Sequence, residues 1–344
     1  HFQWIFSSHA NPGRETIYCL DAAGDNRIGV VNNKGLLTCY GELSDAYYMY
    51  CSHYVPKTRP MIYIVSHTWP DRFAKGPAAR SVTVYSNCDE VALYNDAGSL
   101  LLGRKRKGNF GEPFIFDNVM VNYGLLFARG YVDGVPCVED MIWYENLPMP
   151  ENAEKLMDGQ ECMDANGLDG GYLYRVNCGG EDYLDQYGRL WKKDQPWDGR
   201  GFGFSSWDME YPGLAGDFGS RGRICDRILN TKDQELFQSY RYGREKLSYS
   251  FEVEPGTYEV ELYFTEPWYG RGGLDCARWR LFDVAVNQKT VLSRFDIWKE
   301  AGACRGLKKT VSVQTDQRGL TVHFPKVWSY QAVICAIAIK KKGA

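Results

Sequence analysis

The chain has 344 residues, of which 44% are hydrophobic and 24% are charged, and its formal net charge is −3. This near-neutral balance argues against nucleic acid or a membrane surface as the partner. No apolar run reaches the roughly 20 residues of a membrane-spanning helix. The 11 cysteines include no C-x-x-C pair and the five histidines show no metal-ligand spacing, so neither a metal site nor a cofactor is predicted.

Residues 1–57 predict one strand–loop–helix unit. The stretch "HFQWIF" is a short apolar strand, and "ELSDAYYMYCSHY" at residues 42–54 is a helix that Ser44 could cap. Such a unit cannot form a domain alone, because its apolar strand needs neighbouring strands. The chain starts with His1 rather than with methionine, so we expect it to be processed or cut from a longer one.

Residues 58–146 contain seven short stretches in which apolar and polar residues alternate, from "MIYIVSH" to "VPCVEDMIWY". Turn signals such as "NDAG" separate them at intervals of about ten residues, which is typical of an immunoglobulin-like β-sandwich.

Residues 147–170 are polar and carry proline and glycine, which predicts a linker. Residues 171–344 return to strands, among them "TYEVELYFTE" and "AVICAIAI", and predict a second β-sandwich or jelly roll.

The sequence shows no complete catalytic site. It lacks a G-x-S-x-G elbow and a phosphate-binding P-loop. A retaining glycosidase needs two carboxylates about 5 Å apart, and no pattern pairs two of the 43 acidic residues in this way. We therefore assign no catalytic residue to this chain.

Binding is better supported, because aromatic residues fall in predicted loops or at strand ends. They are Trp207, Tyr240, Tyr242, Trp268 and Tyr269, accompanied by the polar Asn177, Glu181, Asp208, Arg241 and Glu266. Flat rings stack on sugars, and a few polar groups orient the hydroxyls. In "ELYFTEPWYGRGGLDC" we expect the adjacent Trp268 and Tyr269 to be exposed, with the glycines bending the loop away. The alternative is that these aromatics plug the ends of the sandwich.

The segment from Tyr172 to Lys340 resembles the malectin-like carbohydrate-binding domain. The matching pieces include "YRVNCGGEDYLDQYGRLWKKD", "LFQSYRYG", "YFTEPWYG" and "AVICAIAI". The resemblance implies that a short oligosaccharide lies against Trp207, Tyr242, Trp268 and Tyr269. It places Asn177, Gly179, Gly180, Glu181 and Glu266 at the same rim. This chain reads "WSYQ" where animal malectin has an aspartate before the last strand, and it has larger rings at positions 207, 268 and 269, which suggests a different or longer glycan.

Residues 1–146 resemble another family. "FQWIF", "NNKGLLTCYGELSDAYYMYCSHY" and "PMIYIVSHTWPDRF" are similar to the end of the TIM barrel in glycoside hydrolase family 2, and "SVTVYSNCDEVALYND" is similar to the sandwich that follows it. The resemblance implies that residues 1–57 are a barrel remnant and that Trp4 lines a sugar subsite. It also implies that both catalytic glutamates lie before His1, and that the location is the periplasm or the exterior of a bacterium.

Together these observations predict a mainly β chain: a β/α barrel remnant, an immunoglobulin-like sandwich and a malectin-like sandwich. The first functional hypothesis is the non-catalytic C-terminal part of a retaining exo-glycoside hydrolase of the β-galactosidase or β-glucuronidase type. Its partners are an oligo- or polysaccharide and the catalytic barrel of the same protein. The alternative is a stand-alone, lectin-like binding protein without hydrolase activity. A third hypothesis treats both sandwiches as structural spacers with a decayed sugar site.

Overall fold

The computed structural model describes residues 5–10, 31–32, 34–38, 41–157, 161–164, 171–210 and 219–342. The chain divides into two compact units, His1–Pro150 with Arg271–Leu274 and Glu151–Gly270 with Asp275–Ala344. The described part is mainly β, as predicted from the alternating stretches. The division falls inside the predicted linker, at residues 150 and 151. No helix in the described ranges has the length and apolar character to cross a membrane.

The first unit begins with two short strands and one helix. Strands β1 (His9–Ala10) and β2 (Val31–Asn32) are antiparallel, and α1 spans Asp45–Tyr54. The helix confirms the prediction for residues 42–54. Ser44 occupies the N-cap position, but its hydroxyl donates to the carbonyl oxygen of Leu36 at 2.7 Å instead of accepting from the helix. Trp4, the predicted sugar-subsite residue, lies outside the described residues.

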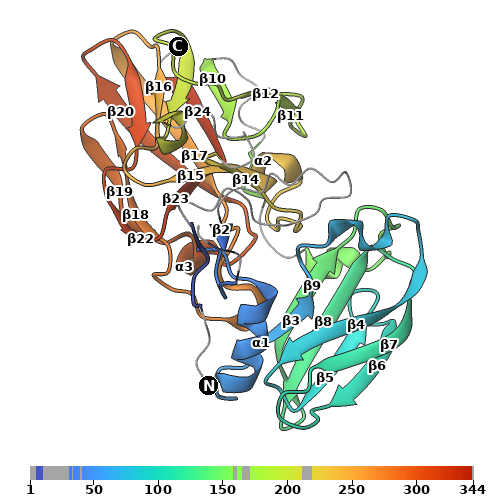
Figure 1. The fold of residues 1–344 in the computed structure, drawn as a ribbon. Coiled ribbons are helices and arrows are strands. Elements are labelled where there is room, and N and C mark those ends of the chain that lie inside the picture. The colour runs from blue at the N-terminus through green and yellow to red at the C-terminus, as the bar shows by residue number, and fades with distance from the viewer. Residues whose placement is uncertain are drawn as a thin grey trace, which may run out of the picture. The chain divides into compact units, whose positions relative to one another are not determined.

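Two antiparallel sheets form the immunoglobulin-like sandwich of the first unit (Figure 1). One contains β3 (Ile62–Val65), β4 (Ala78–Ser86) and β7 (Phe114–Val121). The other, in the order β6-β5-β8-β9, contains β5 (Glu90–Tyr94), β6 (Leu101–Arg106), β8 (Leu125–Val132) and β9 (Val135–Trp143). All seven predicted strands are therefore present. Alternate residues face inward, so that Val82 and Val84 pack in one core with Leu126 and Leu147, the last from the predicted linker.

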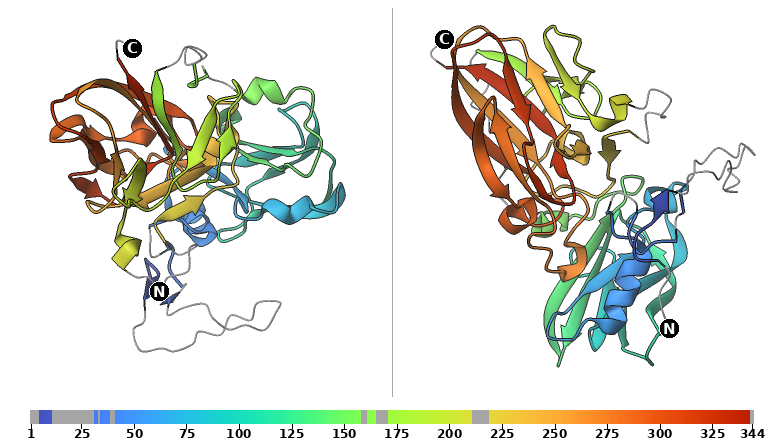
Figure 2. Two further views of the ribbon diagram at one scale, coloured as in Figure 1. Left: turned by 90° about the horizontal axis from the view of Figure 1, so that it is seen from above. Right: turned by 60° about the vertical axis from the view of Figure 1, so that its left-hand side comes forward.

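The second unit is built on two large sheets, seen from further directions in Figure 2. The first, in the order β11-β12-β10-β24-β17-β20, contains β10 (Tyr172–Asn177), β11 (Tyr183–Leu184), β12 (Leu190–Lys193), β17 (Gly256–Phe264), β20 (Leu307–Thr315) and β24 (Ala336–Lys341). The second contains β13 (Phe202–Ser205), β16 (Ser248–Phe251), β18 (Leu281–Val286), β19 (Lys289–Phe295), β21 (Leu320–His323) and β22 (Val327–Ser329). Cross-strand apolar pairs such as Val260–Ile339 and Leu262–Ile337 are fully buried and supply the core.

A third, small sheet of the second unit has the order β14-β15-β23, with β14 at Arg221–Arg223, β15 at Ser239–Gly243 and β23 at Ala332–Ile334. Short helices complete the described chain: η1 (Pro70–Phe73), η2 (Ala153–Leu156), η4 (Trp207–Glu210), α2 (Gln234–Gln238), η6 (Arg271–Gly273) and α3 (Ile297–Ala301).

The stretch "AVICAIAI" is two strands rather than the single strand predicted. Residues up to Ile334 pair with β15, whereas residues from Ala336 pair with β10 and β17. The chain changes sheets at Cys335, whose N–H donates to Tyr263 at 2.9 Å and whose carbonyl oxygen accepts from Cys178 at 2.8 Å. A uniformly apolar run cannot reveal this change, because both halves are equally buried. The chain therefore connects the β14-β15-β23 sheet directly to the sheet that contains β10, β24 and β17.

Candidate functional site

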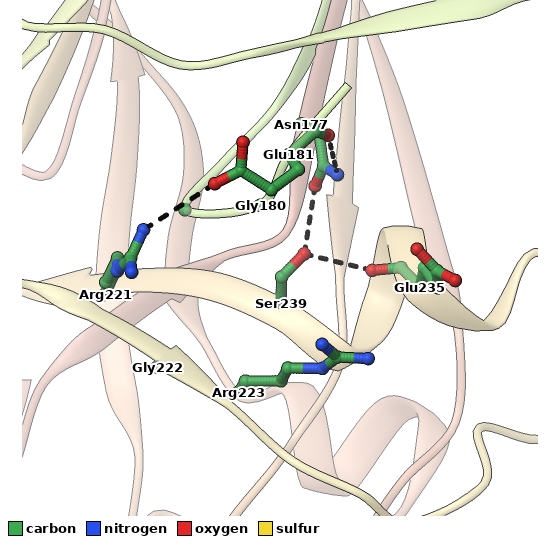
Figure 3. A pocket seen from close by; sticks show the side chains of 9 residues that line it. Asn177, Gly180, Glu181, Arg221, Gly222, Arg223, Glu235 and Ser239 are labelled. Atoms are coloured by element: carbon green, nitrogen blue, oxygen red, sulfur yellow. Dashed lines mark hydrogen bonds and ion pairs between the residues drawn. The ribbon is translucent and has the colours of Figure 1, made fainter. Parts of the chain in front are cut away.

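A cavity of about 360 Å³ opens in the second unit. Its walls come from the turn after β10, from β14, and from the junction of α2 with β15 (Figure 3). The lining residues are Asn177, Gly179, Gly180, Glu181, Arg221, Gly222, Arg223, Glu235 and Ser239. The structure thus brings together four residues that the sequence predicted, all from "NCGGE". The other five were not predicted.

Hydrogen bonds hold the Asn177–Glu181 turn in place. The Asn177 amide nitrogen donates to the Glu181 carbonyl oxygen at 2.9 Å, and the amide oxygen lies 3.0 Å from the Ser239 hydroxyl. That hydroxyl is also 3.0 Å from the carbonyl oxygen of Glu235. Asn177 itself is buried. It therefore positions the turn, and the exposed Glu181 carboxylate is what the turn presents to the cavity.

Both glycines of this turn are required by space, and Gly179 is required by its conformation as well. Gly179 has a φ of +77°, and a Cβ there would lie 2.6 Å from the carbonyl oxygen of Tyr240. A Cβ on Gly180 would lie 2.4 Å from the Asn177 amide nitrogen and 2.5 Å from the Ser239 hydroxyl oxygen. Only glycine lets the backbone lie this close to β15. The backbone of this turn thus lies against the protein's own β15.

A comparison of Gly179 with Gly188 separates the effect of the positive φ from the effect of the steric clash. Gly188 has a φ of +74°, and a Cβ on it would meet nothing within 4 Å, whereas Gly179 has a similar φ and a clash. Both Gly→Ala variants should incur the left-handed strain of about 1–2 kcal/mol. Gly179→Ala should lose a further ~1–3 kcal/mol from overpacking. Chemical denaturation of both variants measures this, and equal losses would show that the turn is not tightly packed.

Strand β14 directs two arginines into the cavity. Side chains at alternate positions of a strand share a face, so Arg221 and Arg223 point the same way. Between them Gly222 is paired with Tyr240, and a Cβ on Gly222 would lie 2.6 Å from the Tyr240 ring. The sequence signal for this wall was the R-G-R alternation in "SRGRICD". A three-residue strand is too short for its pattern to stand out.

A buried ion pair supports the turn from beneath. Asp194 accepts from the Gly179 N–H at 2.9 Å, from the Tyr249 hydroxyl at 2.7 Å and from the Arg241 guanidinium. The side chains of Arg241 and Asp194 are only 8% and 4% exposed. Burial alone lowers the pKa of Arg241, but the hydrogen bonds that Arg241 donates to Asp194 and the nearby negative charges outweigh burial and raise it. Arg241, a predicted sugar contact, therefore has a structural partner.

Trp268 and Tyr269 are buried, so the prediction that water reaches them is wrong. They are 3% and 0% exposed. The Trp268 indole N–H donates to the Tyr240 hydroxyl at 2.7 Å, and the two rings meet edge to face. Tyr269 packs edge to face against Trp279. Loop position did not imply exposure here, because neighbouring side chains, among them the rings of Tyr240 and Trp279, pack against Trp268 and Tyr269.

The buried Glu266 carboxylate holds the Trp268–Tyr269 turn in its inward-facing conformation. Its carboxylate accepts from the N–H groups of Trp268 at 3.0 Å and of Tyr269 at 3.2 Å, and it pairs with Arg280 at 2.6 Å. Both charged side chains are fully buried. Burial alone lowers the pKa of Arg280, but the charge and hydrogen bonds of Glu266 outweigh it and raise that pKa. With its oxygens so engaged, Glu266 organises the turn rather than facing a ligand.

Gly270, which follows Trp268 and Tyr269, allows close packing and does not open the loop to a ligand. Gly270 has a φ of +85°, and a Cβ there would lie 1.6 Å from the Trp298 indole nitrogen. The indole of Trp298 therefore rests against the Gly270 backbone. The prediction that the loop bends away to expose Trp268 and Tyr269 is corrected accordingly.

The remaining predicted aromatics do not line the cavity. Tyr242 is buried, and its hydroxyl donates to the Gly219 carbonyl oxygen at 2.9 Å. Tyr240 and Tyr242 alternate along β15 with Ser239 and Arg241, so the aromatic pair lies on the opposite face of the small sheet from the cavity. Trp207 is half-buried on η4, near Gly243. Asp208 on the same helix accepts from the Ser220 N–H at 2.9 Å.

The cavity offers polar groups of both signs. The carboxylates of Glu181 and Glu235 can accept hydrogen bonds from hydroxyls, and the guanidinium groups of Arg221 and Arg223 can donate to hydroxyls or anions. Its volume is at the lower end of the roughly 300–1,000 Å³ found for small-molecule sites. The arrangement suits a short polar ligand that is rich in hydroxyl groups.

Comparison with known proteins identifies the family of the domain that contains this cavity. The sequence profile of the Malectin domain matches residues 172–343. The Xenopus laevis protein Malectin-B is 30% identical over 193 residues, which cover 52% of this chain and 63% of Malectin-B. A Formosa agariphila protein named "Putative beta-glucuronidase" is 34% identical over 128 residues, which cover 37% of this chain and 14% of that protein.

Among solved structures, the crystal structure of Bacteroides uniformis beta-glucuronidase matches with a TM-score of 0.42 and 26% identity, covering 91% of this chain and 33% of that one. The chain thus spans less than two thirds of each of these relatives. The Malectin domain match extends over half of the chain's 344 residues. The chain therefore belongs to the malectin domain family.

Proposed function

We propose that the second unit binds an oligosaccharide in the cavity between the Asn177–Glu181 turn, β14 and α2. The observation that carries the proposal is a built polar cavity, inside the malectin domain, whose turn is fixed by hydrogen bonds to Asp194 and Ser239. A preformed turn keeps the entropic cost of ordering small when a ligand binds. Carboxylate and guanidinium groups around it match the hydroxyls of a sugar.

Glu235 provides the test of this site. Its side chain is exposed at the cavity wall. A hydrogen bond to a charged group contributes about 1.5–3 kcal/mol, so Glu235→Ala should weaken oligosaccharide binding by about tenfold or more. Glu254→Ala, which removes an exposed carboxylate outside this cavity, should not change it. Isothermal titration of the full chain measures both.

Trp207 is the alternative contact for the sugar, in place of the cavity beside Glu235. It is the half-buried member of the predicted aromatic set, and the sugar-stacking role that the sequence suggested for it is part of the test. If Trp207→Ala abolished binding and Glu235→Ala left it intact, the sugar would lie on the aromatic side and the cavity proposal would fail. If the wild-type chain bound no oligosaccharide, both units would be structural spacers.

We further propose that the chain is the non-catalytic C-terminal part of a retaining exo-glycoside hydrolase of the β-galactosidase or β-glucuronidase type, acting in the periplasm or outside a bacterial cell. The identity to the Formosa agariphila protein and the immunoglobulin-like sandwich in the first unit support this. The alternative is a stand-alone, lectin-like protein. Sequencing the gene upstream of His1 decides: several hundred in-frame codons for a barrel with two catalytic glutamates support the first, and an immediate start or secretion signal supports the second.

A further inference from the structure

The cavity contains two guanidinium groups on one strand, and they are not equivalent. Arg221 lies 4.0 Å from the Glu181 carboxylate, which also lies 3.6 Å from the ammonium group of Lys193. Within the described residues, Arg223 forms no ion pair, either with Glu235 or with any other acid. In Figure 3, Arg221 and Glu181 lie to one side of Ser239, and the ends of Arg223 and Glu235 lie to the other. Arg223 is therefore a positive charge that the described cavity leaves unpaired.

The guanidinium group of Arg223 favours particular acceptor groups on a ligand. A guanidinium group is a planar fork that donates two parallel hydrogen bonds, which match the two oxygens of a carboxylate or a sulfate. Beside it, Glu235 can accept only from hydroxyl or other donor groups. A ligand that carries both an acidic group and hydroxyls would satisfy both side chains.

We propose that the cavity selects an acidic sugar, whose carboxylate or sulfate binds Arg223 and whose hydroxyls bind Glu235. This inference rests on the proposed carbohydrate function and adds the class of sugar. The strand geometry supports it, because Gly222 has no side chain and packs on Tyr240, which fixes the path of β14 beneath Arg223. A uronic acid and a sulfated sugar share this chemistry, and the experiment separates them.

The experiment compares three ligands of equal length on the full chain: an oligosaccharide containing glucuronic acid, its carboxyl-reduced neutral counterpart, and a sulfated counterpart. Titration calorimetry at low and high salt should show that the wild type binds at least one acidic form about tenfold or more tightly than the neutral form. Added salt should reduce the preference, because the interaction is exposed. Preference for the glucuronic acid form identifies a carboxylate, and preference for the sulfated form identifies a sulfate.

Two variants of Arg223 test whether its guanidinium group selects the acidic ligand. Arg223→Gln should weaken binding of the acidic form more than binding of the neutral form and so remove the preference, and Arg223→Lys should keep only part of it because an ammonium group lacks the fork. Arg200→Gln, an exposed arginine of the same unit outside the cavity, should behave as wild type. Equal affinity for acidic and neutral ligands, or an equal loss of both in Arg223→Gln, would overturn the inference alone. Binding of none of the three would overturn the proposed carbohydrate function as well.

Discussion

Replacing Glu266 with alanine should lower the free energy of unfolding by about 3–5 kcal/mol. The substitution leaves the Arg280 guanidinium fully buried without its partner carboxylate, and it also removes the acceptor of the Trp268 and Tyr269 N–H groups. A buried uncompensated charge is among the most destabilising changes a fold can suffer. Denaturant unfolding, followed by tryptophan fluorescence of the full chain, measures the loss.

An exposed ion pair in the same unit gives the control. Asp182 pairs with Lys192 at 3.0 Å, and both side chains are about half exposed, so Asp182→Ala should cost less than about 1 kcal/mol. The double variant Glu266→Leu with Arg280→Met should cost less than the sum of its two single changes, because it leaves no charge behind. A Glu266→Ala loss no larger than that of Asp182→Ala would mean that the pair is open to solvent.

The Asp194→Ala variant should show two effects at once. It removes the principal counter-charge of Arg241 and the acceptor of the Gly179 N–H, so unfolding should become easier by about 3 kcal/mol or more. Because Gly179 belongs to the cavity turn, oligosaccharide affinity should also fall in the variant that remains folded. Thermal unfolding and calorimetric titration of the same sample report the two effects separately.

Asp198 supplies the matched comparison for this variant. Its carboxylate is exposed and accepts only from the Arg200 N–H, at 3.0 Å, in the described structure. Asp198→Ala should therefore change stability by less than about 1 kcal/mol and leave binding unchanged. If Asp194→Ala were destabilised but bound sugar with wild-type affinity, the turn would not depend on this anchor, and the positioning role assigned to Asp194 would be wrong.

The sequence predicted those parts of the fold whose pattern is local and repeated. Alternation with a period of two identified every strand of the immunoglobulin-like sandwich, from Ile62 to Trp143, because one face of each strand is buried. The helix at Asp45–Tyr54 was predicted from Ser44 at the N-cap position. The resemblance to the malectin-like domain placed "NCGGE" at the rim of a binding site, and its four predicted residues line the cavity.

The missed parts depend on contacts between residues far apart in the chain. No local pattern shows that Glu266 meets Arg280, or that Trp268 donates to Tyr240, yet these contacts decide whether the aromatic turn faces water or the interior. The arginine wall was missed because β14 has three residues, fewer than a period-two pattern needs. A loop rich in aromatics and glycine suggests an open binding face, but here an internal carboxylate organises the loop and turns its rings inward.

The central claim is that carbohydrate binds in the cavity between the Asn177–Glu181 turn and β14. The decisive measurement is a crystal structure of the full chain with a bound acidic oligosaccharide. We expect a sugar ring between Glu235 and Arg223, with Trp268 and Tyr269 still covered. A sugar ring stacked on Trp207 or on an opened Trp268–Tyr269 turn, with this cavity empty, would contradict the claim.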